Sequence, residues 1–196
     1  LKALSAETAP DGNFMCEVAV PNKEISFVYN REVLAKLRDI IPQSISVYIQ
    51  EALYTGNVAQ LQEKLQKLLM QSVSYYDTMG ENFYHGLTLG LCAVMDISYR
   101  VMSNREVGDG RCDICMQPKK NDLPGIILEF KAARNVSEDD LKKLSRKALK
   151  QIDDRHYDRG FSNEEVRSVL KYGIAFSGKN VEIASESDFH GTAERI

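Results

Sequence analysis

The chain has 196 residues, which is enough for one large domain or for a small domain with an accessory helical region. With 43% hydrophobic and 27% charged residues, its composition is that of an ordinary globular protein and argues against a disordered or fibrous chain. The formal net charge of −3 gives no overall signal for nucleic acid, so a surface that binds nucleic acid would have to be local.

The sequence carries no sign of a membrane segment or of a secretion signal. No run of about 18 apolar residues predicts a membrane span. The first residue is Leu, and no basic segment followed by an apolar one precedes a cleavage site. We therefore interpret the start as a fragment boundary and expect a cytoplasmic protein.

The first part of the chain predicts one strand followed by helices. The segment FMCEVAVPN, residues 14–22, reads as a short strand that ends at Pro21, after which Asn22 caps a helix that runs to about Ile41. Two further helices are predicted over residues 43–57 and 58–76, the second with leucines at helical spacing. No constellation of reactive side chains lies here, so residues 1–76 are interpreted as a helical linking region.

The second part predicts a helix, three strands, a second helix and a closing pair of strands. These elements cover residues 81–96, 97–107, 111–118, 126–132, 138–157 and 168–185. Short connections make antiparallel pairs, and only the helical crossover makes a parallel one, so we expect a mixed sheet in an α/β domain over residues 77–186. Residues 187–196 show no periodicity and are predicted to be a tail.

The four cysteines, Cys16, Cys92, Cys112 and Cys115, are too few and too scattered for a disulfide framework. Cys112 and Cys115 match C-x-x-C, but a second pair at zinc-finger spacing is absent. Two residues three apart in a strand project to opposite faces. We therefore expect Cys112 and Cys115 to be unlinked and free of metal.

Charged residues interrupt two of the apolar strands. Period-2 geometry places Glu129 and Lys131 on one face of the strand IILEFKA, and Asp113 lies in the strand before it. If these faces coincide, two carboxylates and an ammonium group converge. Two carboxylates can hold Mg²⁺, and a lysine beside them can neutralise charge that develops on a phosphate. The alternative is an ordinary solvated strand face.

Two helices add further candidates. Glu81 and His85 lie one turn apart on the helix that precedes the strands. Gln151 lies at the edge of the apolar stripe of the later helix. Basic residues that could meet phosphates crowd the rest of that helix, although a charge run is more often a solvated face. They are Lys142, Lys143, Arg146, Lys147 and Lys150.

Five motifs in this order resemble the PD-(D/E)XK nuclease superfamily. They are ENFYHGL, SNREVGDGRCDI, IILEFK, ALKQI and KYGIAFSGK, and they lie within residues 81–184. The arrangement is similar in particular to the nuclease-like domain at the C-terminus of bacterial proteins that begin with an AAA-ATPase-like domain. This resemblance implies a restriction-endonuclease-like core of helix, three strands, helix and strand, preceded by a helical region.

The resemblance also implies roles for single residues. Asp113 takes the place of the metal-binding Asp, Glu129 that of the second acid and Lys131 that of the motif lysine. Glu81 resembles the acid on the leading helix, as a third metal ligand, and Gln151 the polar residue of the later helix. No role follows for His85. No Pro directly precedes Asp113, where the name of the superfamily would place one.

The implied function is a Mg²⁺-dependent or Mn²⁺-dependent nuclease that acts on nucleic acid, with DNA favoured over RNA, and Lys143, Lys147 and Lys150 as contacts to phosphates. The ATPase part is missing, because no G-x-x-x-x-G-K-[ST] motif occurs. Two alternatives remain. One is a nuclease fold that binds nucleic acid or a protein without cutting, and the other is a regulatory domain for the absent ATPase.

Overall fold

The computed structural model of the chain describes residues 2–8, 14–19, 43–72, 80–93, 95, 97–120, 122–161 and 166–189. The chain forms two compact units, Leu1–Ile40 and Ile41–Ile196. No helix within these described ranges combines the length and the apolar character that a membrane crossing needs.

The first unit contains an antiparallel pair of strands, β1 (Lys2–Thr8) and β2 (Phe14–Ala19). Strand β2 confirms the strand predicted after residue 14, whereas β1 was not predicted. The predicted helix from Asn22 to Ile41 lies outside the described residues.

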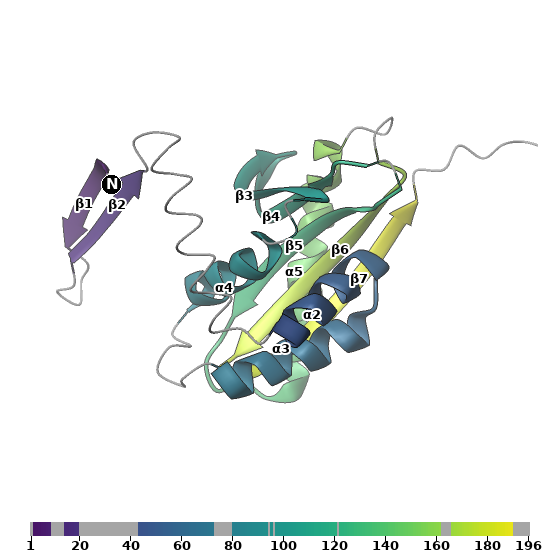
Figure 1. Cartoon of the computed structure of the whole chain (residues 1–196). Helices are drawn as coiled ribbons and strands as arrows, with labels where there is room; N and C mark the ends of the chain where they lie inside the picture. Colours follow the sequence, from purple (N-terminus) through teal and green to yellow (C-terminus); the bar gives the residue numbers. More distant parts are fainter. Residues whose placement is uncertain are drawn as a thin grey trace, which may run out of the picture. The chain divides into compact units, whose positions relative to one another are not determined.

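The second unit is built on a five-stranded sheet in the order β3-β4-β5-β6-β7, coloured from teal to yellow in Figure 1. Its strands are β3 (Tyr99–Val107), β4 (Gly110–Pro118), β5 (Gly125–Ala132), β6 (Ser168–Ser177) and β7 (Asn180–Phe189). Only β5 and β6 are parallel, and all other neighbours are antiparallel. The predicted mixed sheet is therefore confirmed, and its one parallel pair is joined through a helical crossover.

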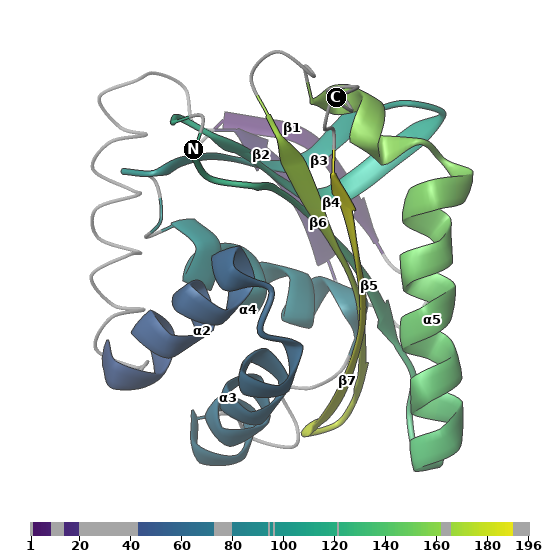
Figure 2. The ribbon, with the colours of Figure 1, turned by 90° about the vertical axis from the view of Figure 1, so that its right-hand side faces the viewer.

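Helices cover both faces of this sheet (Figure 2). Helices α2 (Gln43–Thr55), α3 (Val58–Ser72) and α4 (Glu81–Ala93) lie on one side, and α5 (Glu138–Asp154) lies on the other. On the first side, the ring of Tyr84 stacks on Phe176 at 4.2 Å between centroids, and the Tyr172 hydroxyl donates to the Leu53 carbonyl at 2.7 Å. Helix α2 therefore packs as part of the same unit as the sheet, and α3 belongs to this unit as well.

The alternation along β5 assigns its side chains to these two layers. Ile126, Leu128 and Phe130 point to one side, and Ile127 packs with Ile152 of α5 on the other. Because Glu129 and Lys131 share the face of Ile127, the strand carries its two charges on the α5 side. The position of α5 therefore decides what these charged groups contact.

Helix α5 begins as the sequence predicts. The Ser137 hydroxyl accepts a hydrogen bond from the Asp140 backbone N–H at 3.2 Å, and three acidic residues occupy the first turn, where they oppose the positive end of the helix dipole. The helix ends at Asp154, and a 3₁₀ turn (η2, Tyr157–Gly160) follows the left-handed residue His156.

Candidate active site

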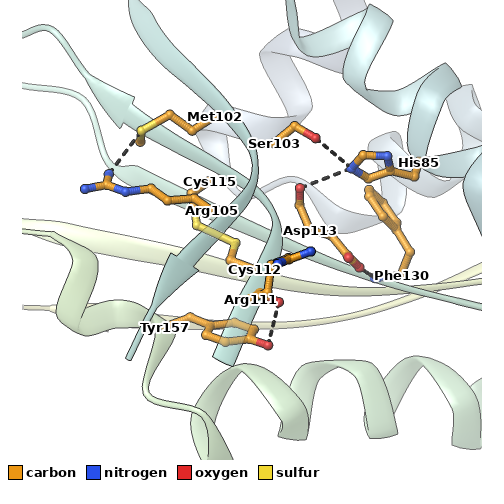
Figure 3. The surroundings of a disulfide bond; sticks show 10 residues. All are labelled: His85, Met102, Ser103, Arg105, Arg111, Cys112, Asp113, Cys115, Phe130 and Tyr157. Carbon is orange, nitrogen blue, oxygen red and sulfur yellow. Dashed lines mark hydrogen bonds between the residues drawn. A yellow bond between two sulfur atoms is a disulfide. The ribbon is translucent and has the colours of Figure 1, made fainter. Parts of the chain in front are cut away.

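Asp113 lies where β4 separates from β5. The two strands pair only from Ile114 to Met116, so the backbone ladder begins one residue after Asp113. At that point the Asp113 side chain takes over, because its Oδ2 accepts the backbone N–H of Phe130 at 2.8 Å (Figure 3). The carboxylate is thereby fixed next to Glu129, the residue before Phe130 in β5.

Glu129 is a buried carboxylate with one satisfied oxygen and one unsatisfied oxygen. Its side chain lies in the α5-facing layer and is 3% exposed. Oε1 accepts hydrogen bonds from Lys131 Nζ at 3.1 Å and from Gln151 Nε2. Oε2 is buried and has no hydrogen-bond partner among the described residues. A buried carboxylate oxygen without a partner is costly, so this atom is suited to a ligand from outside the chain.

Burial and the neighbouring charges explain the pKa of Glu129. Burial is the largest effect, and together with the nearby Asp113 carboxylate it raises the pKa of Glu129 to about 7, against the opposing effect of Lys131. A buried carboxylate whose ionisation is made more costly by a neighbouring carboxylate is typical of sites that bind a cation. A bound divalent ion would remove the repulsion that burial leaves uncompensated.

A glycine on β6 brings α5 to Glu129. Gly173 is the parallel-register partner of Glu129, and a Cβ at this position would collide with backbone atoms of Ser145 and Leu149 in α5. The missing side chain lets the helix lie directly on the strand. Gln151, half a turn beyond Leu149, then reaches the Glu129 carboxylate.

A second contact fixes the same end of the helix. Lys171 of β6 is almost fully buried and donates to Asp153 Oδ1 at 2.7 Å. Its side chain lies on the α5 face, two residues before Gly173 on the same strand. Neither Gly173 nor this ion pair was predicted as part of the site, because both depend on how a helix lies across strands distant in sequence.

His85 approaches Asp113 from the opposite side of the sheet. Its Nε2 lies 3.1 Å from the Asp113 carbonyl oxygen and 3.1 Å from Ser103 Oγ (Figure 3). A carbonyl oxygen only accepts, so Nε2 must carry the proton and donate to Asp113. The ring also packs against Phe130 at 5.9 Å between centroids. His85 therefore contacts Asp113 itself and Phe130, the residue whose backbone N–H donates to the Asp113 carboxylate.

Glu81 is not brought into this group. It lies in the first turn of α4, one turn before His85, with an exposed side chain. No group of three His, Cys, Asp or Glu residues suited to a metal occurs in the part of the chain that the structure describes. The two carboxylates of β4 and β5 therefore form a pair, and Glu81 remains a candidate for a third ligand.

The basic residues of α5 are partly neutralised along the helix. Lys143 pairs with Asp140 at 2.8 Å, and Lys150 pairs with Asp154 at 2.6 Å. The first of these pairs raises the pKa of Lys143, chiefly through its hydrogen bond to Asp140, and both place acids beside the expected phosphate contacts. Lys147 is exposed, and no ion pair of it is seen among the described residues.

Cys112 and Cys115 form a disulfide, so the prediction that they are unlinked was wrong. Their Cα atoms are 6.4 Å apart, and both side chains belong to the same buried cluster beneath α5. Strict alternation would separate them, but it holds only for a regular strand, and β4 is irregular at Asp113, which is skipped by the pairing with β3 and precedes the start of the ladder with β5 at Ile114. The C-x-x-C spacing around Asp113 is the sequence signal for this disulfide, although period-2 geometry argues against it.

The residues present fit a divalent metal ion. Asp113 and Glu129 offer oxygen ligands, the kind that Mg²⁺ and Mn²⁺ prefer. The buried Oε2 of Glu129 has no partner among the described residues, and the proximity of Asp113 makes the pair costly without a cation. Gln151 and Lys131 support this ligand, because both donate hydrogen bonds to the other oxygen of Glu129, Oε1, and thereby orient the carboxylate.

Comparison with known proteins agrees with this arrangement. The family model described as the PD-(D/E)XK nuclease superfamily matches residues 79–186, more than half of the chain. No curated protein matches the chain. The match indicates a nuclease-type function, and nucleases of this superfamily generally use divalent metal ions. The matched region contains α4, α5, most of the sheet and every residue of the site described above. The chain therefore belongs to the PD-(D/E)XK nuclease superfamily.

Proposed function

We propose that the chain is a metal-dependent nuclease that hydrolyses phosphodiester bonds of nucleic acid. One observation carries the proposal: the buried Glu129 carboxylate, oriented through Oε1, has an Oε2 without a partner among the described residues, beside Asp113. A buried carboxylate beside a half-buried one, with one oxygen left for a ligand, is a poor structural element and a good cation site.

Asp113 and Glu129 would hold Mg²⁺ or Mn²⁺. When bound, such an ion polarises the phosphoryl oxygen and lowers the pKa of a water ligand. Glu81 is the candidate for a third carboxylate, since it lies on α4 one turn from His85, which contacts Asp113. A hard cation such as Mg²⁺ keeps several water ligands, so two or three carboxylates are sufficient.

Lys131 is assigned the role of charge stabilisation. Its Nζ lies 3.1 Å from Glu129 Oε1, and the side chain is 22% exposed, so one N–H remains available to a phosphate oxygen from outside. Gln151 donates to the same Glu129 oxygen and fixes the direction of Oε2. Lys131 would thus contact the substrate, whereas Gln151 would act through Glu129.

His85 is assigned a positioning role. Its Nε2–H donates to the carbonyl of Asp113, and its ring packs on Phe130, whose backbone N–H donates to the Asp113 carboxylate. The imidazole thereby holds the backbone of the metal-binding strand without facing the metal itself. This gives His85 a function that the sequence left open.

Nucleic acid is the proposed partner, with DNA favoured over RNA, and α5 is the proposed contact surface. Lys147 is the strongest candidate for a phosphate contact. Lys143 and Lys150 would first have to break their ion pairs with Asp140 and Asp154 before each could bind a phosphate. Exposed ion pairs of this kind are worth little, so the exchange is not costly. Counterion release from the phosphates would favour it.

The motifs also support a proposal about the whole protein. We infer that the chain is the C-terminal part of a larger bacterial, cytoplasmic protein with an AAA-ATPase-like domain, with residues 1–76 as the linking region, 77–186 as the nuclease-like domain and 187–196 as a tail. The alternative, a module that binds without cutting and regulates the ATPase, predicts the same fold without cleavage.

A cleavage assay separates these two functions. Single-stranded and double-stranded DNA and RNA are incubated with the wild type and Mg²⁺ or Mn²⁺ under single-turnover conditions. We expect cleavage by the wild type, loss of it in Asp113→Ala and Glu129→Ala, and a reduction on the order of 10² to 10³ in Lys131→Ala. Asp139→Ala, which changes an exposed acid of α5, is the control and should cut normally. Undiminished cutting by Asp113→Ala would exclude the proposed site.

A further inference from the structure

The disulfide between Cys112 and Cys115 encloses the proposed metal ligand Asp113. Only Asp113 and Ile114 lie between the two cysteines, so the bond closes a small ring that contains this acid (Figure 3). Such a short ring removes little entropy from the unfolded chain, and stabilisation is therefore a weak reason for the bond. Its position next to Asp113 points to the site instead.

Both sulfur atoms are packed in the core. Cys112 is 0% and Cys115 is 3% exposed, and both lie in one cluster with side chains of α5, η2, β5 and β6. The other buried members are Val107, Ile127, Ile152, Tyr157, Phe161, Val166 and Val169. Two thiols need a wider separation than two bonded sulfurs. In a close-packed interior this extra volume displaces neighbouring atoms.

The backbone around Asp113 is the part that can yield. On one side of Cys112, the carbonyl of Arg111 accepts the Tyr157 hydroxyl at 2.8 Å. On the other side, the ladder to β5 begins only at Ile114. Cys112 pairs with Arg105 of β3, whereas neither ladder of β4 includes Asp113. Displacement on reduction therefore falls on Asp113, and the hydrogen bond from the Phe130 N–H to Asp113 Oδ2 is the contact that it disturbs.

We propose that Cys112 and Cys115 form a redox modification site that sets the position of the Asp113 carboxylate, with the disulfide form holding it for the metal and the dithiol form releasing it. The second half of this proposal rests on the proposed nuclease function. The first half concerns only the chain itself, and it is testable without any metal.

The chemistry is thiol–disulfide exchange with a low-molecular-weight thiol. In reduction, the external thiolate attacks the sulfur of Cys115, the slightly more exposed residue, and forms a mixed disulfide while Cys112 leaves as a thiolate that takes up a proton. A second external thiol then attacks the external sulfur of the mixed disulfide and releases Cys115 as a thiol. Two external thiols become one disulfide, and the protein disulfide becomes two thiols. Burial makes the exchange slow, so equilibrium must be reached before measurement.

Cys92 supplies a matched control. Cys92 is also fully buried, but it is free, and burial raises the pKa of its thiol to about 12, which leaves it without thiolate character. Cys92→Ala therefore tests whether any buried cysteine produces the effect. The double variant Cys112→Ala, Cys115→Ala cannot change between a dithiol and a disulfide at this position. Cys16 is present in every protein compared, so it contributes equally to all thiol counts.

The test compares the protein equilibrated with oxidised glutathione or with dithiothreitol. Mass spectrometry after alkylation in denaturant counts the free thiols, NMR measures hydrogen exchange of the Phe130 amide without metal, and a Mn²⁺ titration gives the metal affinity. We expect two additional thiols after reduction, faster exchange of Phe130 and Mn²⁺ binding weaker by about tenfold to a hundredfold, the usual cost of a lost supporting contact. Cys92→Ala should respond like the wild type, and the double variant should not respond.

Each outcome decides between the two halves of the proposal. A Phe130 exchange rate that is equal in both redox states, or a failure of Cys112 and Cys115 to oxidise, overturns the redox inference. A change in Phe130 exchange without Mn²⁺ binding in either state supports the redox effect on Asp113 and overturns the metal site. A response of the double variant equal to that of the wild type overturns the assignment to these two cysteines.

Discussion

The backbone N–H of Phe130 donates a 2.8 Å hydrogen bond to the carboxylate of Asp113, at the point where the ladder between β4 and β5 has ended. A side chain thus replaces a backbone acceptor and is fixed beside Glu129. The other contacts of the site, from His85, Lys131 and Gln151, hold one or the other of these two acids.

The first prediction concerns pH. The pKa of Glu129 is about 7, above its usual value of 4.5, so between these values the folded protein binds more protons than the unfolded chain. The free energy of unfolding must then fall as pH rises through this window and change no further above it. Glu129→Gln removes this contribution. Urea unfolding in EDTA at several pH values should show wild type and variant diverging by about 1 to 3 kcal/mol between pH 4.5 and 7. Parallel curves would contradict the raised pKa.

The second prediction concerns the close approach of α5. Gly173→Ala places a Cβ against backbone atoms of Ser145 and Leu149, so the helix must move away from β6. We expect a loss on the order of 1 to 3 kcal/mol of unfolding free energy and weaker Mn²⁺ binding, because Gln151 moves away from Glu129.

A second glycine serves as the matched control for this substitution. At Gly86 in α4, an added methyl group would meet nothing within 4 Å, so Gly86→Ala should stabilise the protein by about 0.5 to 1 kcal/mol. Equal effects of the two substitutions in chemical denaturation would show that contact with α5 is not the reason for Gly173.

The third prediction concerns His85. Because its Nε2–H donates to the Asp113 carbonyl, His85→Gln, whose amide nitrogen can take a similar place, should keep most of the Mn²⁺ affinity. His85→Asn is too short to reach and should lose about tenfold. Both variants lose the ring contact with Phe130 alike, so their difference reports the hydrogen bond alone. Identical affinities in a Mn²⁺ titration would rule out the positioning role.

The fourth prediction concerns the surface of α5. Lys147→Ala should lower the slope of log affinity against log salt by about one unit, since one phosphate contact is lost. Lys143→Ala changes the net charge in the same way and serves as the comparison. Its effect on the slope should be smaller, because Lys143 is already paired with Asp140 at 2.8 Å. Fluorescence anisotropy with a labelled oligonucleotide, in EDTA to prevent cleavage, gives both slopes. An unchanged slope in Lys147→Ala would move the nucleic-acid surface away from α5.

Much of the fold follows from local patterns in the sequence. The order of helices and strands in the second unit, the mixed sheet and the Ser137 cap are determined by periodicity, turn residues and connection length, and all are seen in the structure. The sharing of one strand face by Glu129 and Lys131 follows from period-2 geometry in the same way, because β5 is a regular central strand.

The parts that were missed depend on contacts between distant segments. The disulfide depends on the irregularity of β4 at Asp113, which both ladders of the strand leave unpaired and which the composition of β4 does not reveal. The contact of His85 with Asp113 requires α4 to pack on the sheet beside the middle of β4. The ion pair of Lys171 with Asp153 requires the close approach of α5 to β6 that Gly173 allows. Strand β1 lacks a recognisable strand pattern and is defined by its pairing with β2.

The fifth prediction is the most direct test of the central claim, that Asp113 and Glu129 together hold a divalent ion. Calorimetric titration of Mn²⁺ into the oxidised protein should give one saturable site in the wild type and in the control Asp139→Ala, and no measurable site in Asp113→Ala, because the remaining acid lacks charge and geometry for the ion. Equal Mn²⁺ affinity in Asp113→Ala and wild type, or no binding by the wild type, would contradict the account.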